Sequence, residues 1–237
     1  MHLRRLQINR EKFPVTDRYP FNLKSLSSTG AIELSTPVTF FVGENGSGKS
    51  TLLEALARCC QIYIWGDSEK VQYVPNPYVE RFHSVLDIAW QDSRVPGSFF
   101  GSQVFRNYTK LIETWACSDP GILDYYGGKS LLTQSHGQSI MSFFEACFKV
   151  KGLYLLDEPE AGLSPGSQMK LLELFKRYSA DGTAQFIVAT HSPVLMSLSG
   201  SNILSFDHAP VTEIDFKESQ NYKMYRSIFT SDMERKL

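Results

Sequence analysis

Short apolar runs alternate with stretches of helical spacing along most of this chain. The runs at residues 152–157, 185–190 and 202–206 are continuously apolar, which is typical of strands covered on both faces. Residues 3–9 and 31–42 predict two further strands ahead of the first helix. Several strands of this kind indicate a sheet that forms the centre of the fold.

Helices are predicted between these strands. Apolar residues recur with helical spacing over 52–57, 108–116, 140–148 and 166–179. Continuously apolar strands that are separated by helices predict a parallel sheet with helices on both faces, so the expected fold class is α/β. The last twenty residues are charged and predict a surface helix or a partner contact.

Length and composition fit one globular unit. The 237 residues suit a single domain spanning 1–237, with a short irregular or helical insertion at about 66–130. Apolar residues make up 42% of the chain and charged residues 21%, which is ordinary for a globular protein. A formal net charge of −1 argues against a strongly basic nucleic-acid-binding surface.

From its sequence, the chain is expected to carry neither a membrane-spanning segment nor an export signal. No apolar run approaches the roughly 20 residues that span a bilayer, and the N-terminus has no signal-peptide stretch. Its four cysteines form no CxxC pair, so we expect reduced core thiols rather than a metal site or disulfides. The expected compartment is the cytoplasm.

The glycine-rich segment at 43–51 carries the clearest chemistry. It reads GENGSGKST, fits the G-x-x-x-x-G-K-[ST] phosphate-loop pattern, and follows an apolar strand at 38–42. In a strand–loop–helix setting, backbone N–H groups hold the α- and β-phosphates of a nucleoside triphosphate. Lys49 is then expected on the β- and γ-phosphate oxygens, and the Ser50 hydroxyl on Mg²⁺. The predicted nucleotide-binding residues are Gly43, Glu44, Asn45, Gly46, Ser47, Gly48, Lys49, Ser50 and Thr51.

Two acids end the apolar run at 153–156. A buried strand delivers Asp157 to the carboxyl edge of the sheet, beside the phosphate loop, where its carboxylate can hold Mg²⁺ directly or through water. Glu158 points elsewhere and can polarise an attacking water as a general base. Together with the phosphate loop, this pair predicts a magnesium-dependent nucleotide site.

The order of six segments resembles that of an ABC-class ATPase. They are GENGSGKST, Gln103, SHGQS at 135–139, LYLLDEPE at 153–160, AGLSP at 161–165 and ATHSP at 189–193. The chain is most similar to the soluble branch with SMC-like and DNA-repair ATPases and short stand-alone bacterial AAA-family members, over roughly residues 30–207. The resemblance implies an ATPase head: a mostly parallel sheet with flanking helices and an N-terminal antiparallel β region.

The resemblance also implies roles for residues outside the phosphate loop. Gln103 would touch Mg²⁺ and the attacking water, with a plain polar loop residue as the alternative, and His191 would contact the γ-phosphate. Ser135, Gly137 and Gln138 match the signature motif LSGGQ, which binds the nucleotide of a partner protomer. His136 stands where that motif has glycine, and either senses nucleotide or fills space.

The implied activity is hydrolysis of Mg²⁺–ATP by an ATP-dependent homodimer that moves a partner, an effector protein or DNA. One alternative is a slow nucleotide-gated switch that regulates a nuclease or toxin in a bacterial defence system. A transporter ATPase subunit ranks lower. The interval 52–134 is too short for coiled-coil arms. Tyr19 or Phe21 either stacks on adenine or packs within its loop.

Overall fold

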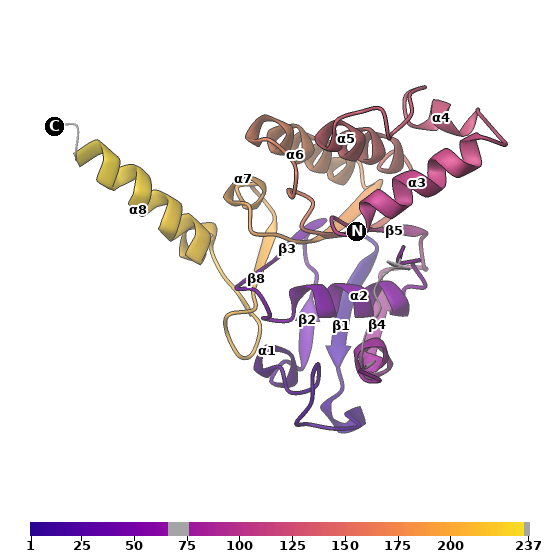
Figure 1. The fold of residues 1–237 in the computed structure, drawn as a ribbon. Coiled ribbons are helices and arrows are strands. Elements are labelled where there is room, and N and C mark those ends of the chain that lie inside the picture. The colour runs from indigo at the N-terminus through magenta and orange to yellow at the C-terminus, as the bar shows by residue number, and fades with distance from the viewer. Residues whose placement is uncertain (66–75, 235–237) are drawn as a thin grey trace.

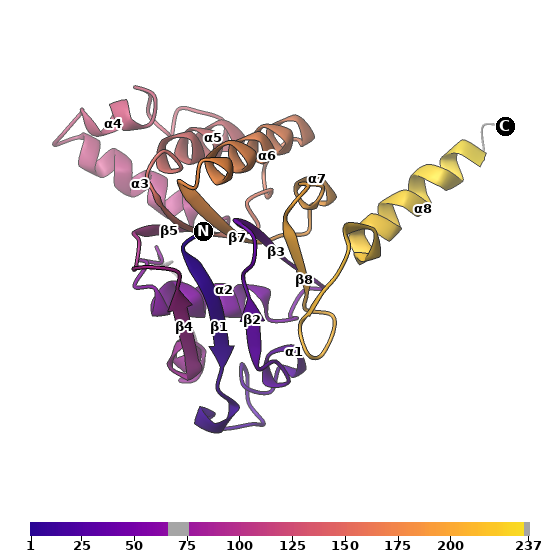
Figure 2. The same ribbon diagram turned by 180° about the vertical axis from the view of Figure 1, so that it is seen from behind.

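The structure is a computed structural model that describes residues 1–65 and 76–234, with side chains described up to residue 230 (Figure 1). Part of the segment expected to be irregular, residues 66–75, lies outside this description. The fold is α/β, as the apolar pattern predicts. Two sheets and the helices packed on them build the body, and the C-terminal helix extends away from it (Figures 1 and 2).

The larger sheet holds every strand that the continuous apolar runs predict. Five of its strands pair in parallel and the last one is antiparallel. The order is β5 (Gly97–Gly101), β6 (Gly152–Asp157), β7 (Ala184–Ala189), β3 (Val38–Val42), β8 (Asn202–Ser205) and β9 (Thr212–Glu213). The carboxyl ends of β3, β6, β7 and β8 therefore share one edge, as the placement of the candidate site requires.

The smaller sheet is the antiparallel β region that the resemblance implies. Its order is β2 (Ala31–Glu33), β1 (Leu3–Ile8) and β4 (Leu86–Trp90). The expectation of one strand over 31–42 is wrong, because the chain leaves the small sheet after β2 and enters the large one at β3. The expected insertion at 66–130 is also only partly irregular or helical, since β4 and β5 belong to the two sheets. The single-domain division stays a prediction.

Helices cover both faces of the large sheet (Figures 1 and 2). On one face lie α3 (Phe105–Ala116), α5 (His136–Cys147) and α6 (Pro165–Ala180), and on the other lies α2 (Lys49–Cys59). The small sheet packs against α2 from outside. Shorter helices are α1 (Lys24–Ser27), α4 (Ile122–Tyr125) and α7 (Pro193–Met196), and the last is α8 (Gln220–Glu234). Three 3₁₀ segments are η1 (Arg10–Lys12), η2 (Val79–Val85) and η3 (Phe216–Glu218).

Alternate residues of each central strand enter two separate cores. Phe40 packs under α5 and α6, whereas its neighbour Phe41 packs against α2 and the small sheet. Phe186 and Ile187 divide in the same way. Because the side-chain period of a strand is two, a run that is apolar at every position can fill both cores.

The four cysteines agree only in part with the expectation that all of them lie in the core. Cys60 is buried, but Cys117 is exposed, which corrects that expectation.

One buried polar side chain joins the two sheets. Gln185, on β7, is fully buried, and its Oε1 accepts from the backbone N–H groups of His2 and Leu3, each at 2.7 Å. Its Nε2 donates to the Leu3 carbonyl at 2.8 Å. The carboxamide thus satisfies three backbone groups at the start of β1.

Gln185→Leu is expected to destabilise the protein by roughly 1–3 kcal/mol or more, the cost of leaving a buried backbone group unpaired. Chemical denaturation measures the change. Gln91→Leu, at an exposed position, is the control and should change stability by less than about 0.5 kcal/mol. Equal stability of the two variants would show that this carboxamide does not link the sheets.

Candidate active site

The segment 43–48 forms a tight loop between β3 and α2, where the sequence places it. Gly43, Gly46 and Gly48 have φ values of 140°, 78° and 105°, which residues with a Cβ rarely adopt. A Cβ on Gly43 would lie 2.9 Å from Oδ1 of Asp207, and one on Gly48 would lie 3.1 Å from Leu23. The glycines therefore allow both the turn and its close packing.

Two side chains outside the loop fix its shape. The Ser25 hydroxyl donates to the Ser47 carbonyl at 2.6 Å. The backbone N–H of Glu44 donates to Oδ1 of Asp207 at 2.7 Å. Sequence reasoning missed both supports. Asp207 had a usable signal, since it directly follows the apolar strand at 202–206; Ser25 had none.

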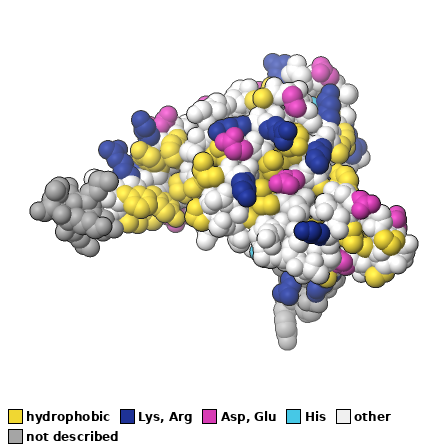
Figure 3. Space-filling view, turned by 90° about the horizontal axis from the view of Figure 1, so that it is seen from above, with side chains coloured by type: hydrophobic (Ala, Val, Ile, Leu, Met, Phe, Trp, Pro, Cys, Tyr) yellow, Lys and Arg dark blue, Asp and Glu magenta, His cyan; other side chains and the backbone are white. Residues whose placement is uncertain are grey.

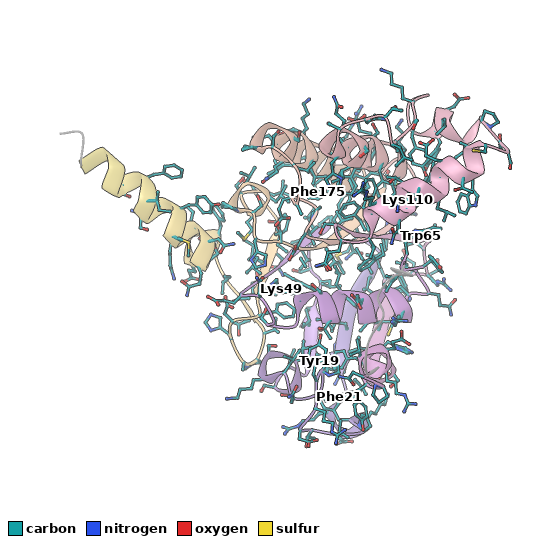
Figure 4. The ribbon with its side chains drawn as sticks, viewed as in Figure 1. Tyr19, Phe21, Lys49, Trp65, Lys110 and Phe175 are labelled. Atoms are coloured by element: carbon teal, nitrogen blue, oxygen red, sulfur yellow. The ribbon has the colours of Figure 1, made fainter. Side chains whose placement is uncertain are left out.

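Lys49 is buried, with 5% of its surface exposed, at the start of α2 (Figure 4). Its ammonium donates to the carbonyls of Gly43 and Glu44, at 2.7 and 2.8 Å. Burial lowers the pKa of Lys49, and the carboxylates of Asp207 and Glu158 oppose that shift. The ammonium thus lies inside the loop, where β- and γ-phosphate oxygens would replace the two carbonyls as its partners.

Ser50 and Asp157 meet beside Lys49. The Ser50 hydroxyl donates to Oδ1 of Asp157 at 2.9 Å. Burial raises the pKa of Asp157 to about 6, while the Ser50 hydrogen bond opposes the rise. A hydroxyl and a carboxylate held together are oxygen ligands of the kind Mg²⁺ takes, so this pair fits the magnesium ion that the sequence implies.

The chain turns sharply after Asp157. Glu158 has a φ of 49°, and its N–H donates to the Ala189 carbonyl at 2.9 Å. This conformation directs the residue out of the strand. Glu158, Gly43, Glu44 and His191 line one cavity of about 860 Å³, so the predicted general base faces the same space as the phosphate loop.

In the structure Gln103 follows a strand, which the sequence alone did not establish. The strand is β5, whose Gly101 pairs in register with Asp157. The N–H of Ser102 also donates to the Asp157 carbonyl at 3.2 Å. Gln103 therefore belongs to the turn beside the metal pair, with its side chain exposed. Contact with Mg²⁺ or water stays a prediction.

His191 lies just beyond β7, in the cavity of the phosphate loop. Its N–H donates to Oε1 of Glu160 at 2.7 Å, and its carbonyl accepts from Nδ2 of Asn221 at 2.5 Å. Nε2 is buried, and no hydrogen-bond partner for it is present among the described residues. Burial lowers the pKa of His191, and the charge of Lys49 lowers it further. A neutral ring with a free nitrogen fits a phosphate-contacting role.

The segment 135–139 begins α5 on the helical face of the sheet. The Ser135 hydroxyl accepts from the N–H of Gln138 at 3.4 Å, and Oε1 of Gln138 accepts from the N–H of Ser135 at 3.0 Å. This capping box holds the helix start. Gly137 and Gln138 line a separate cavity of about 450 Å³, in which no residue of the phosphate loop takes part. The structure does not bring the two sets of predicted nucleotide contacts together.

His136 fills space next to the segment 161–165. A Cβ built on Gly162 would overlap the His136 ring, and one on Gly137 would lie 3.1 Å from the Gly162 carbonyl. The other side of the ring lies toward Phe105, with ring centroids 6.3 Å apart. Histidine fits at this motif position because Gly162 has no side chain, and its packing joins α5, α3 and the loop at 161–165.

Phe21 is unsuited to stacking on adenine. It is 1% exposed and packs against Phe13 and Phe82, with ring centroids 4.9 and 5.5 Å apart. Tyr19 is 42% exposed, and its hydroxyl lies 2.6 Å from Oγ1 of Thr51 (Figure 4). Of these two aromatics, Tyr19 alone is accessible near the loop.

Comparisons with known proteins match both halves of this site. A family model described as "AAA domain" matches residues 21–71, and one described as "AAA domain, putative AbiEii toxin, Type IV TA system" matches residues 133–197. The ferric enterobactin transport ATP-binding protein FepC of Escherichia coli is 29% identical over 158 residues, covering 60% of this chain and 58% of FepC. The hemin import ATP-binding protein HmuV of Bradyrhizobium diazoefficiens is 26% identical and covers 88% of this chain and 84% of HmuV.

The fold agrees with these matches. A nucleotide-free ATP-binding cassette from an ABC transporter superposes with a TM-score of 0.57 and 13% identity, covering 96% of each chain. The chain is therefore similar in sequence to ATP-binding proteins of the ABC class, and it has the fold of an ATP-binding cassette. It spans 58% of FepC and 29% of a Bacillus cereus relative with an ABC transporter ATP-binding name. None of the helices in the described parts of this chain is long and apolar enough to cross a membrane.

Asp157→Asn is expected to stabilise the nucleotide-free ATPase at neutral pH. The folded-state pKa of about 6 lies above the ordinary 3.8, so the native state binds the proton more tightly than the unfolded state. Stability is therefore lost as pH rises from about 4 to 6. Asparagine removes that loss and still accepts from Ser50, a gain of up to about 3 kcal/mol at pH 8.

Denaturant unfolding without nucleotide or magnesium, at pH 4 and pH 8, measures this gain. The difference between wild type and variant should be small at pH 4 and large at pH 8. A variant that is less stable than wild type at pH 8 would show that the carboxylate contributes more than it costs.

Proposed function

We propose that two copies of this chain close head to tail around two Mg²⁺–ATP molecules and hydrolyse them to move a partner. The observation that supports this most directly is the separation of the two cavities. The phosphate loop, Glu158 and His191 line one cavity, whereas Gly137 and Gln138 line the other. A second copy can supply the signature segment that the first cavity lacks.

The chain's own residues then divide the work. Lys49 exchanges the carbonyls of Gly43 and Glu44 for phosphate oxygens. Ser50 and Asp157 would hold Mg²⁺, which would supply positive charge to neutralise the phosphates. The Glu158 carboxylate accepts a proton from the water as its oxygen bonds to the γ-phosphorus, and the bond from that phosphorus to the bridging oxygen breaks to release ADP. Neutral His191 donates from Nε2 to the γ-phosphate. Ser135 and backbone N–H groups at the start of the partner's α5 add donors to the same phosphate.

The dimer should form only when both parts of the composite site are intact. Glu158→Gln retains binding and slows turnover, so with Mg²⁺–ATP it should double in mass in size-exclusion light scattering. Adding Ser135→Arg should keep that protein monomeric, because arginine fills the space of the partner's phosphate. Ser84→Arg, at an exposed position outside both cavities, should leave the dimer intact.

Nucleotide binding by each variant is measured separately, and Lys49→Ala serves as the non-binding control. A Ser135→Arg variant that binds ATP and still dimerises would contradict the head-to-tail arrangement.

Glu158→Gln should also lower kcat at least roughly a hundredfold, within the range that one general base contributes. The ATP affinity of the variant should change little, because the glutamine keeps the size of the side chain and leaves the phosphate loop untouched. Phosphate release gives kcat, and equilibrium binding gives Kd. Turnover within a few-fold of wild type would assign water activation to another residue.

Two further hypotheses differ in the kind of partner that is moved. The AAA model matched over 133–197, whose description includes a toxin system, favours a slow switch that regulates a nuclease or toxin effector. The names of FepC and HmuV favour a transporter subunit. Turnover measured with DNA, with a co-encoded protein and with membranes distinguishes them, since only the true partner should change the rate.

A further inference from the structure

The C-terminal helix borders the cavity of the phosphate loop and donates one side-chain hydrogen bond to the loop after β7. Asn221, in the first turn of α8, donates from Nδ2 to the His191 carbonyl at 2.5 Å. Asn221 and His191 both line the cavity of the phosphate loop. The two residues are 30 positions apart in sequence, so the contact joins the end of the chain to the loop after β7.

The other hydrogen bonds around His191 are made with elements other than α8. Its N–H donates to Glu160, and the preceding Thr190 N–H donates to the Phe41 carbonyl at 3.1 Å. Ser192 is anchored to Gln168 on α6 at 2.6 Å. Phe41 belongs to β3 and Gln168 to α6, and Glu160 lies in the loop between β6 and α6. The carbonyl alone is held from α8, by Asn221.

The remainder of α8 extends away from the body. Its root is fixed by η3, where the Phe216 and Tyr222 rings pack with centroids 4.8 Å apart. Beyond that turn, Met224, Tyr225 and Phe229 are 60%, 47% and 63% exposed. Figures 1 and 2 show the helix extending from the body, and Figure 3 shows hydrophobic side chains exposed along it.

From this geometry we propose that Asn221 is a positioning residue: α8 holds the His191 loop in the orientation that contacts the γ-phosphate, and displacing α8 releases it. This inference rests on the proposed function, because His191 matters only if the chain hydrolyses ATP. It goes further by making the C-terminal helix a control element of turnover. The buried Nε2 of His191 has no hydrogen-bond partner among the described residues. The hydrogen bond from Asn221 would set the direction of this nitrogen by holding the loop.

Two variants remove the hydrogen bond in different ways. Asn221→Ala deletes the side chain, whereas Asn221→Asp keeps its shape and replaces the donating NH₂ by an acceptor. Aspartate is favourable in the first turn of a helix, so the second variant is expected to fold. Ser227→Ala, exposed on the same helix, is the matched control.

Both Asn221 variants should lower kcat roughly threefold to tenfold, as the loss of one hydrogen bond implies, and leave KM for ATP unchanged. The decisive comparison is a double-mutant cycle. In a His191→Ala background, Asn221→Ala should have no further effect, because it acts through the histidine. Effects that multiply in the double variant, or an unchanged kcat in both single variants, would overturn the proposal.

A second measurement does not depend on turnover. The NMR signals of the His191 ring, assigned by their loss in His191→Ala, should move in both Asn221 variants and stay in place in Ser227→Ala. Unchanged ring signals would refute the positioning role even if the protein proves to hydrolyse nothing. A wild-type protein without turnover but with moving ring signals would instead refute the proposed function and keep the structural coupling.

Discussion

The burial of charge at the carboxyl edge of the large sheet governs the rest of this structure. Lys49 sits 5% exposed among the carboxylates of Asp157, Glu158 and Asp207. Burial is unfavourable for the charged forms of both groups. It lowers the pKa of Lys49 and raises the pKa of Asp157, so each shift favours the neutral form. The free-energy cost of burying Lys49 and Asp157 must be offset by the packing of the two apolar cores.

The same edge carries more negative than positive groups. A triphosphate that entered it would meet the carboxylates of Asp157, Glu158 and Asp207 as well as the ammonium of Lys49. Backbone N–H groups of the loop offset part of that repulsion, and a divalent cation on Ser50 and Asp157 offsets more. The charge balance of the site, like its oxygen ligands, thus supports the proposed use of magnesium. The raised pKa of Asp157 implies that a proton competes with the metal below about pH 6.

Sequence reasoning found the parts of the fold whose cause is local. Three apolar runs gave β6, β7 and β8, since a strand buried on both faces must be apolar throughout. It missed β4, whose burial alternates with exposure and whose partner β1 lies some eighty residues earlier. The phosphate loop was found because glycine spacing is written in the sequence. Ser25 and Asn221 were not, because each acts through one contact with a distant backbone carbonyl.

Phe21 illustrates a different limit. An aromatic residue in a loop near a nucleotide site can stack on a base or anchor the loop, and composition does not distinguish these outcomes. Here packing with Phe13 and Phe82 decides for the anchor. Gln103 illustrates another limit. The strand before it has weak apolar character and was not recognised from the sequence, and pairing with β6 stabilises it in the structure.

The packing of His136 bears on how the two cavities communicate. Its ring touches the space above Gly162, between α5 and the loop that follows Glu158, and its other side lies toward Phe105 of α3. A glycine at position 136, as in the common motif, would leave these three elements without that contact. Movement of the signature segment, once a partner's phosphate engages it, would then press on the loop carrying Glu160. Because Glu160 accepts from the His191 N–H, the histidine at position 136 would, in the proposed dimer, link the signature segment mechanically to the His191 loop.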